Sequence, residues 1–190
     1  SNELCRIFDV DMSLLPGVKP SQGEFGITQA LDQSLPIMAV AGDQQASLFA
    51  AGNHPGTLKV TGGTGLFTAK LLGDTFELKD GYTTSLAVSH NQNPQYYLEA
   101  HLEGTGQQYD EALIHPETKP GVAKEITERA AKLVKPLLEA NSPPIIFDGG
   151  MSQDPVFVDA LQTATGHPVQ TQTTPEGTAL GIAKLLSLSS

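Results

Sequence analysis

Two short apolar runs that lie far apart in the chain end in a similar way, and this pattern restricts the fold more than any other feature. Residues 37–41 are followed by Gly-Asp (42–43), and residues 145–147 are followed by Asp-Gly-Gly (148–150). Short apolar runs bounded by glycine are typical of buried strands, and ligands bind at the carboxyl ends of strands in open α/β sheets. The pattern therefore predicts an α/β domain whose site is built at strand ends.

The order of the other elements indicates a mixed sheet flanked by helices. Antiparallel strand pairs come first, and helix, strand, helix, strand and helix follow, which is typical of an α/β fold with a parallel portion. Pro136 is expected to shorten the longest helix, because its ring clashes with a carbonyl of the preceding turn. We expect strands at 25–27, 37–41, 57–61, 66–72, 83–90, 95–100, 145–147 and 167–170, helices at 3–9, 44–51, 104–113, 122–140, 155–165 and 175–188, and a loop at 115–121.

Composition limits the classes of partner. The 190 residues suit a single domain and carry a net charge of −10, whereas nucleic acids and anionic membranes require clustered Lys and Arg. No apolar run approaches the roughly 18 residues of a membrane helix, and the start does not resemble a signal peptide. The one cysteine, Cys5, has no partner for an internal disulfide. We therefore expect a cytoplasmic protein without nucleic-acid or membrane partners.

Asp43 is the first candidate for catalysis. A carboxylate at the carboxyl end of a strand can accept the proton of a sugar or glycerol hydroxyl and hold that hydroxyl in line with a phosphoryl group. The alternative is an N-cap, in which the side chain accepts N–H groups of a helix that begins at Gln44. The two interpretations are compatible.

The sequence Thr-Gly-Gly-Thr-Gly (61–65) joins two predicted strands. Glycines in a hairpin tolerate a positive φ, and without Cβ atoms they let backbone N–H groups approach phosphate oxygens closely, while Thr64 adds a hydroxyl. The plain alternative is a tight turn. The stretch is not a Walker A loop, because no Lys follows and it does not open a helix.

The Asp-Gly-Gly at 148–150 allows either an ordinary strand-to-helix turn or a close backbone approach to an adenosine. Asp154 follows at a predicted helix start, where Asp and then Pro155 are favoured, and it would lie near the purine. Gly177 and Gly181 lower the stability of the last helix relative to alanine. Close packing against a strand is the favoured explanation, and a helix N-terminus that faces a nucleotide cleft is the alternative. The five histidines show no metal-ligand spacing, so no metal site is predicted from side chains.

Three segments in this order resemble the C-terminal domain of the FGGY carbohydrate kinases. They are AVAGDQQASLFAAG (39–52), LKVTGGTGLFTAK (58–70) and IIFDGGMSQDPVFVDALQTATGHPVQTQTTPEGTALGIAKLL (145–186). The weaker stretches 14–26 and 96–110 also fit, so the resemblance covers most of the chain. It implies a ribonuclease H-like fold of the actin/hexokinase ATPase type, with one C-terminal nucleotide-binding domain over residues 1–190.

The resemblance also implies residue roles. Asp43 would be the catalytic base and Gln44 would contact the acceptor. The residues that would face the phosphates of ATP or lie along the nucleotide are Gly63, Thr64, Gly65, Gly106, Gly149, Gly150 and Asp154. The implied reaction is transfer of the γ-phosphate of ATP to a hydroxyl of glycerol or a small sugar such as xylulose, with Mg²⁺ neutralising charge.

The chain also departs from the family pattern. The family's N-terminal lobe, with most acceptor contacts, is absent, so we expect the chain alone to be inactive. The oligomeric state stays open, with a homo-oligomer as one outcome, because an uncovered apolar face favours artefactual association. A long family insertion is reduced to residues 114–121, and Asp110 and Asp154 each replace an amide residue. These changes motivate an alternative, a degenerate nucleotide-binding or interaction module without transfer activity. A plain α/β domain with structural glycine turns is the third hypothesis.

Overall fold

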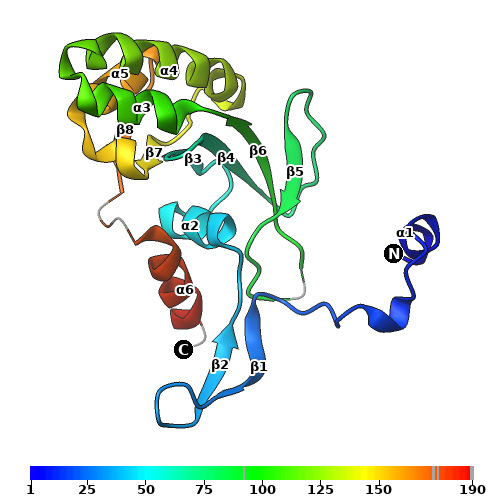
Figure 1. Ribbon diagram of the computed structural model, residues 1–190. Helices are drawn as coiled ribbons and strands as arrows, with labels where there is room; N and C mark the ends of the chain where they lie inside the picture. Colours follow the sequence, from blue (N-terminus) through cyan, green and yellow to red (C-terminus); the bar gives the residue numbers. More distant parts are fainter. Residues whose placement is uncertain (92, 173, 175, 189–190) are drawn as a thin grey trace.

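A mixed six-stranded sheet forms the centre of the fold in the computed structural model, which describes residues 1–91, 93–172, 174 and 176–188 (Figure 1). Its strand order is β5-β6-β4-β3-β7-β8. Neighbours from β5 to β3 run antiparallel, whereas β3, β7 and β8 run parallel. The strands are β3 (Leu58–Gly62), β4 (Leu66–Gly73), β5 (Thr83–Leu86), β6 (Tyr96–Leu102), β7 (Ile145–Asp148) and β8 (Val169–Thr171). The predicted mixed α/β sheet is therefore confirmed.

Helices cover both faces of this sheet. Figure 1 shows α3, α4 and α5 gathered on one side and α2 and α6 on the other, and the two buried apolar clusters agree with this division. The helices are α2 (Asp43–Ala51), α3 (Thr105–Ile114), α4 (Lys119–Val134), α5 (Pro155–Thr165) and α6 (Gly177–Ser187). No described helix combines the length and the apolar character that a bilayer span requires.

Side chains alternate between the two faces along β3 and β7, as the strand period demands. Leu58 and Val60 of β3 and Ile145 and Phe147 of β7 pack with α4 and α5 in the main core, and each is at most 1% exposed. By the same alternation, Lys59 and Thr61 of β3 and Asp148 of β7 point to the α2 face. These polar residues line the candidate site.

Local sequence signals explain the limits of two helices. The Asp154 carboxylate accepts the Val156 N–H at 3.1 Å and caps α5, which ends at Gly166 in the left-handed conformation, with φ 69°. At Pro136 the helix α4 gives way to the 3₁₀ turn η3 (Lys135–Leu137), as expected. Since α4 begins at Lys119, the loop predicted at 115–121 instead holds the 3₁₀ turn η2 (Pro116–Thr118) and the first residues of α4.

The apolar run at 37–41 is not part of the central sheet. Most of it lies in β2 (Leu35–Ala39), which pairs antiparallel with β1 (Gln22–Thr28) in a separate two-stranded sheet. Its side chains are largely open to solvent, and Met38 is 42% exposed. The prediction of a buried strand is wrong here, because a two-stranded ribbon has little surface with which to cover either of its faces.

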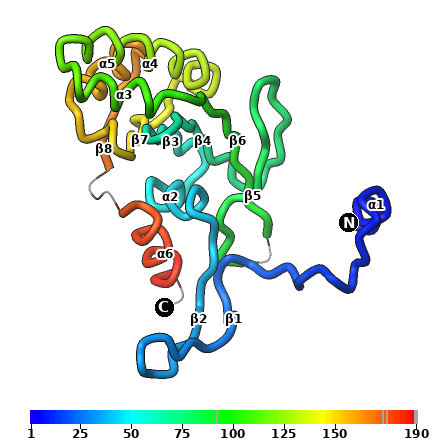
Figure 2. Tube along the Cα trace, viewed as in Figure 1, coloured from blue at the N-terminus to red at the C-terminus, as the bar shows by residue number. Residues whose placement is uncertain are grey.

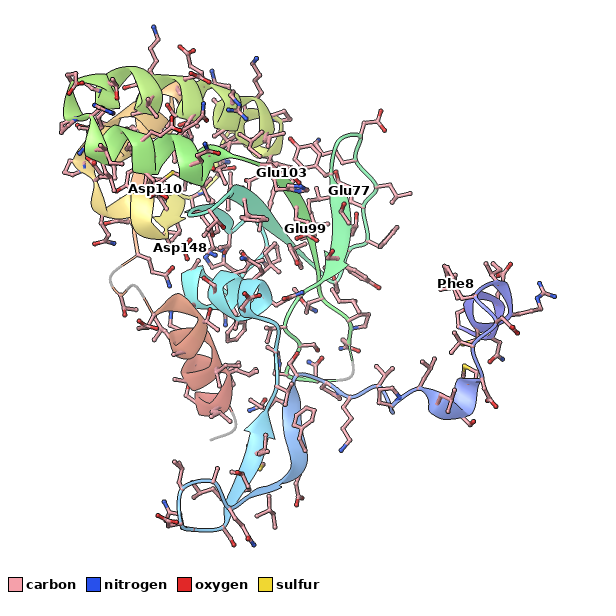
Figure 3. The ribbon with its side chains drawn as sticks, viewed as in Figure 1. Phe8, Glu77, Glu99, Glu103, Asp110 and Asp148 are labelled. Carbon is pink, nitrogen blue, oxygen red and sulfur yellow. The ribbon has the colours of Figure 1, made fainter. Side chains whose placement is uncertain are left out.

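The N-terminal segment forms an arm that extends away from the sheet (Figure 2). It holds α1 (Asn2–Ile7), which confirms the helix expected at 3–9, and the 3₁₀ turn η1 (Met12–Leu14). Figure 3 shows Phe8 on this arm, far from the central sheet. Phe8 is 71% exposed and Leu4 is 53% exposed, so the apolar face of α1 is open to solvent.

The start of the last helix lies close to residues outside the described part. We expected Thr174 and Pro175 to open it, and Pro175 is not among the described residues. The Thr174 hydroxyl accepts the Glu176 N–H at 3.2 Å, and α6 begins at Gly177.

Candidate functional site

Asp43 is the first residue of α2 and directly follows the N-cap residue Gly42. Its Oδ1 accepts the N–H of Gln44 at 2.7 Å, and an acidic side chain in the first turn of a helix interacts favourably with the helix dipole. Thr178 of α6 donates its hydroxyl to the Asp43 carbonyl at 3.4 Å. The N-cap interpretation of Asp43 is therefore wrong, because the N-cap is the preceding residue, Gly42. The exposed Asp43 carboxylate lies in the first turn of the helix.

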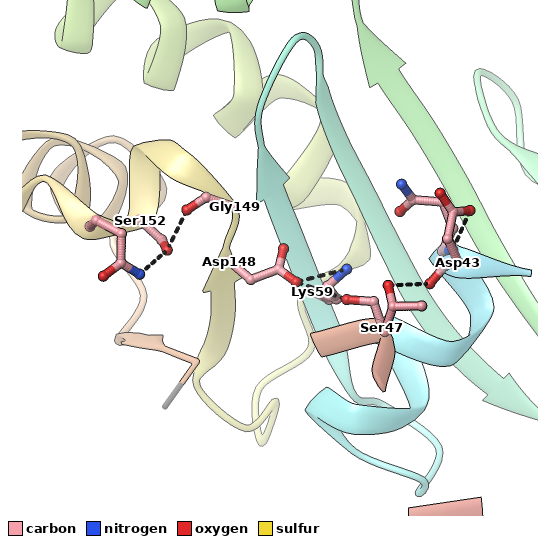
Figure 4. Close-up of polar contacts among 9 residues, drawn as sticks. Asp43, Ser47, Lys59, Asp148, Gly149 and Ser152 are labelled. Carbon is pink, nitrogen blue, oxygen red and sulfur yellow. Dashed lines mark hydrogen bonds and ion pairs between the residues drawn. The ribbon is translucent and has the colours of Figure 1, made fainter. Parts of the chain in front are cut away.

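Asp43 borders a cavity of about 160 Å³ on the α2 face of the sheet, which we call the acid cavity. Its walls come from α2, the first turn of α6, and the carboxyl ends of β3 and β7. Figure 4 shows Asp43, Ser47, Lys59 and Asp148 in this region. The lining residues are Asp43, Gln44, Ser47, Lys59, Thr61, Asp148, Gly149, Gly177 and Thr178.

A buried ion pair forms the floor of the acid cavity. Lys59 Nζ lies 3.1 Å from Asp148 Oδ2, and the Ser47 hydroxyl donates to the same oxygen at 2.9 Å. The Lys59 side chain is 2% exposed and that of Asp148 is 11% exposed. Burial lowers the pKa of Lys59, and the carboxylates of Asp148 and Asp43 partly offset that effect. Lys59 is not among the predicted site residues, and its signal in the sequence is a lysine between two apolar residues of a predicted strand.

A second cavity, of about 370 Å³, lies beside the first, and we call it the glycine cavity. Backbone and small side chains make up much of its wall, from the β3–β4 hairpin, the start of α3 and the segment after β7. Its residues are Gly62, Gly63, Thr64, Gly106, Gln107, Tyr109, Asp110, Gly150 and Met151. Burial raises the pKa of Tyr109, and Asp154 raises it further.

Close backbone contacts explain why glycine is required at two of the predicted site positions. A Cβ atom on Gly106 would lie 2.5 Å from the Cα of Thr64, and a Cβ on Gly149 would lie 2.3 Å from the carbonyl oxygen of Gly62. Gly149 also has φ 83°, a conformation that L side chains avoid. These glycines let three segments meet: the β3–β4 hairpin, the start of α3 and the end of β7.

Close packing, and not an unusual turn conformation, explains two of the three hairpin glycines, Gly62 and Gly65. None of Gly62, Gly63 and Gly65 has a positive φ, so the expected conformational reason is wrong. A Cβ on Gly62 would lie 2.8 Å from the Cβ of Met151. The Gly63 N–H donates to the Gly65 carbonyl at 2.9 Å, so this donor is already used within the turn.

The predicted site residues fall into two adjoining groups. Asp43, Gln44 and Gly149 line the acid cavity, whereas Gly63, Thr64, Gly106 and Gly150 line the glycine cavity. The two cavities meet where Gly149 joins Gly150 and where Thr61 joins Gly62. Asp43, at the start of α2, and the glycine turns therefore border two adjoining cavities.

Gly65 and Asp154 line neither cavity. A Cβ on Gly65 would lie 3.1 Å from the Leu102 carbonyl oxygen, so this glycine packs against β6. Asp154 caps α5 and forms an ion pair with Lys119 at 2.8 Å. Both positions support the walls of the glycine cavity from behind.

The two glycines of the last helix pack against a helix and not against a strand as we predicted. A Cβ on Gly181 would lie 1.9 Å from the carbonyl oxygen of Ala46, and a Cβ on Gly177 would lie 2.9 Å from the hydroxyl oxygen of Ser47. Both contacts are with α2. The close packing of α6 thus holds the helix that carries Asp43.

Comparison with known proteins finds several glycerol kinases among the sequence relatives. No protein-family model matches the chain. The glycerol kinase of Desulforamulus reducens is 44% identical over 105 residues, which are 53% of this chain and 21% of that protein. The glycerol kinase of Brachyspira hyodysenteriae is 41% identical over 93 residues, which are 48% of this chain and 19% of that protein.

Solved structures match over nearly the whole chain. The glycerol kinase of Plasmodium falciparum with ADP has a TM-score of 0.86 at 19% identity, covering 97% of this chain and 50% of that one. The xylulose kinase of Rhodospirillum rubrum has a TM-score of 0.79 at 16% identity, covering 100% of this chain and 51% of that one. The chain thus spans about half the length of these structures, and its matches span about a fifth of the curated relatives.

The fold is that of the actin/hexokinase-like class, in the form found in carbohydrate kinases. The sequence comparison points to a narrower group of proteins than the fold does. About half of the chain is similar in sequence to part of several glycerol kinases, and the resemblance to the FGGY carbohydrate kinases is confirmed.

Proposed function

We propose that residues 1–190 form the nucleotide-binding domain of an ATP-dependent carbohydrate kinase. The reaction is transfer of the γ-phosphate of ATP to a hydroxyl of glycerol or of a small sugar such as xylulose. The observation that carries the proposal is the junction of the acid and glycine cavities at Gly149 and Gly150. Phosphoryl transfer requires a proton acceptor and a phosphate site side by side.

Asp43 is assigned as the general base. Its carboxylate is exposed at the edge of the acid cavity, where it can accept the proton of an acceptor hydroxyl as that oxygen attacks the γ-phosphorus. Gln44 follows it and lines the same cavity, so its amide is assigned to another hydroxyl of the acceptor.

The glycine cavity is assigned to the nucleotide. Its volume of about 370 Å³ lies within the range of small-molecule sites. Cβ atoms at Gly106 and Gly149 would collide with the cavity's own backbone, so the smooth glycine wall depends on these residues. The first turn of α3, which has a favourable dipole for anions, forms part of this wall, and Thr64 adds an exposed hydroxyl.

Magnesium fits this site chiefly as a partner of the nucleotide. The described residues contain no group of three or more His, Cys, Asp or Glu side chains able to hold a metal ion. Mg²⁺ prefers few protein carboxylates together with phosphate oxygens and water. When bound, the ion supplies charge neutralisation at the transferring phosphoryl group.

The acceptor site is completed by residues beyond these 190. In the solved structures that share this fold, the matching part is about half of the chain. In-line transfer needs the acceptor and the phosphoryl group held in a fixed geometry, so both walls of a cleft are required. We therefore expect the 190-residue chain to bind Mg-ATP and to show no turnover by itself.

The test uses Asp43→Asn in the product of the full reading frame that contains this chain. Loss of the general base is expected to lower kcat for glycerol or xylulose phosphorylation by about 10²–10⁴-fold. Mg-ATP affinity, measured by calorimetry, should stay unchanged, because Asp43 lies outside the glycine cavity.

The matched control is Asp32→Asn, at an exposed position between β1 and β2. It removes one carboxylate from the same part of the chain and should retain full turnover. Wild-type turnover in Asp43→Asn would refute the assigned base. A wild-type protein that neither binds Mg-ATP nor phosphorylates either acceptor would refute the proposed function.

A further inference from the structure

The proposed function assigns no role to the buried ion pair of the acid cavity. Lys59 and Asp148 come from neighbouring parallel strands, and the register places Thr61, two residues after Lys59, opposite Asp148. Both side chains are largely buried, with exposures of 2% and 11%. The pair therefore forms the floor of the cavity and does not lie at its opening.

Stability alone does not account for this pair. Removing two charges from water is unfavourable, and apolar side chains of similar volume often serve a fold as well as a buried ion pair does. The Asp148 Oδ1 atom is also buried and accepts no hydrogen bond from the described residues. The Asp148 carboxylate is thus held by the two groups that meet its other oxygen, Lys59 and Ser47.

Ser47 connects the pair to the catalytic helix. It lies four residues after Asp43, so the two side chains occupy the same face of α2, one turn apart. Its hydroxyl donates to Asp148 Oδ2 at 2.9 Å and joins α2 to the carboxyl end of β7. A continuous set of contacts therefore runs from Lys59 through Asp148 and Ser47 to the turn that carries Asp43.

We propose that Lys59 is a positioning residue of the phosphoryl-transfer site. Its ammonium group holds the Asp148 carboxylate, and the Ser47 hydrogen bond transmits this position to the first turn of α2 and the Asp43 carboxylate. Its positive charge also offsets the two carboxylates of the acid cavity, so that a phosphate can approach them. This inference rests on the proposed function of Asp43.

The chain supplies a matched control in a second strand lysine. Lys70 of β4 is 9% exposed and forms an ion pair with Glu139. Lys70 lies opposite Leu58 in the β3–β4 register, so it faces α4, whereas Lys59 faces α2. Lys70 lines neither the acid cavity nor the glycine cavity.

The first experiment compares Lys59→Met and Lys70→Met in the product of the full reading frame. For Lys59→Met we expect kcat to fall by about 100-fold, the size of effect that a misplacement of about 1 Å produces. The KM for Mg-ATP should remain near the wild-type value, because the glycine cavity is intact. Lys70→Met should keep wild-type kcat.

A charge-free variant separates positioning from folding. Lys59→Met combined with Asp148→Leu removes both charges, so thermal stability should recover relative to Lys59→Met alone. The low kcat should persist in this double variant. Recovery of kcat together with stability would overturn the proposal, because it would show that Lys59 acts only through folding.

A readout without turnover uses Ser47→Ala in the 190-residue chain. This variant keeps the ion pair and breaks only its connection to α2. Amide hydrogen exchange in α2 should become faster, while exchange in α5 stays unchanged. If Lys59→Met fails to fold, Ser47→Ala in the full product decides the question, with a kcat reduced by about tenfold expected for one lost hydrogen bond of about 1.4 kcal/mol.

The two proposals fail in different ways. A wild-type product that phosphorylates neither glycerol nor xylulose refutes the proposed function, and the exchange experiment still tests the connection to α2. Wild-type kcat in Lys59→Met, or unchanged α2 exchange in Ser47→Ala, refutes the positioning role while leaving the proposed function intact.

Discussion

The acid cavity and the glycine cavity share an edge but differ in what makes their walls. The acid cavity holds three charged side chains, Asp43, Lys59 and Asp148, in about 160 Å³. The glycine cavity is larger, about 370 Å³, and four of its nine lining residues are glycines, at 62, 63, 106 and 150. One cavity is built by charge placement and the other by the omission of side chains.

This difference indicates two kinds of sensitivity. Buried charges depend on their partners, so a change in the acid cavity should act through an uncompensated charge. A backbone wall depends on shape, so a change in the glycine cavity should act through a steric shift. Substitutions in the acid cavity are therefore expected to change charge balance and turnover. Substitutions in the glycine cavity are expected to change nucleotide affinity.

The largest effect on stability is expected in the acid cavity, from Lys59→Met in the 190-residue chain. The substitution leaves Asp148 buried with only the Ser47 hydroxyl as a partner. Breaking a buried pair in this way lowers the free energy of unfolding by about 3–5 kcal/mol. Urea denaturation measures the loss.

Lys70→Met should lower the free energy of unfolding by less than Lys59→Met. Its partner Glu139 is exposed, with 74% of its side chain open to solvent, and an exposed carboxylate that loses its partner stays hydrated. An equal loss of stability in Lys59→Met and Lys70→Met would remove the distinction between the two lysines.

The sequence predicted the central sheet and its helices because each depends on a local pattern. The apolar run of β7, the Asp-Pro start of α5 and the stop at Pro136 all act within a few residues. The run at 37–41 has the same apolar composition, yet β2 lies outside the central sheet. A run of apolar residues indicates a strand but does not tell which other strands are available to cover it.

The candidate site was predicted only in part, because some of its residues belong to local motifs and others meet only through the fold. Asp43 and the hairpin glycines were found from short motifs, but the reason given for these glycines was wrong. None of them has a positive φ, and close approach explains Gly62 and Gly65. Lys59 was missed since its partner Asp148 is far away in the chain and meets it only through strand pairing. Contacts of this kind become visible only in the folded chain.

An effect of intermediate size is expected in the glycine cavity, from Gly106→Ala. The added Cβ would lie 2.5 Å from the Cα of Thr64, so the hairpin must move. Overpacking of this kind costs about 1–3 kcal/mol, and we expect it to appear as weaker Mg-ATP binding by calorimetry. The ligand-induced rise in Tm should shrink in parallel.

Gly121→Ala is the matched control for Gly106→Ala. Gly121 lies in the first turns of α4, where an added Cβ meets no atom within 4 Å. Alanine favours the helix by up to about 1 kcal/mol relative to glycine, so this variant should be slightly more stable and bind nucleotide normally. Equal nucleotide affinity in the two variants would argue against the glycine cavity as the nucleotide site.

The smallest effect is expected behind the glycine cavity, from Asp154→Ala. This side chain caps α5 and pairs with Lys119, and it lines neither cavity. Loss of an N-cap costs about 1 kcal/mol, which urea denaturation can measure, and Asp154→Asn should keep most of it because Asn also caps helices. The family resemblance instead implies contact between residue 154 and the nucleotide. A fall in Mg-ATP affinity in Asp154→Ala, larger than its loss of stability, would favour that contact and extend the nucleotide site beyond the glycine cavity to the start of α5.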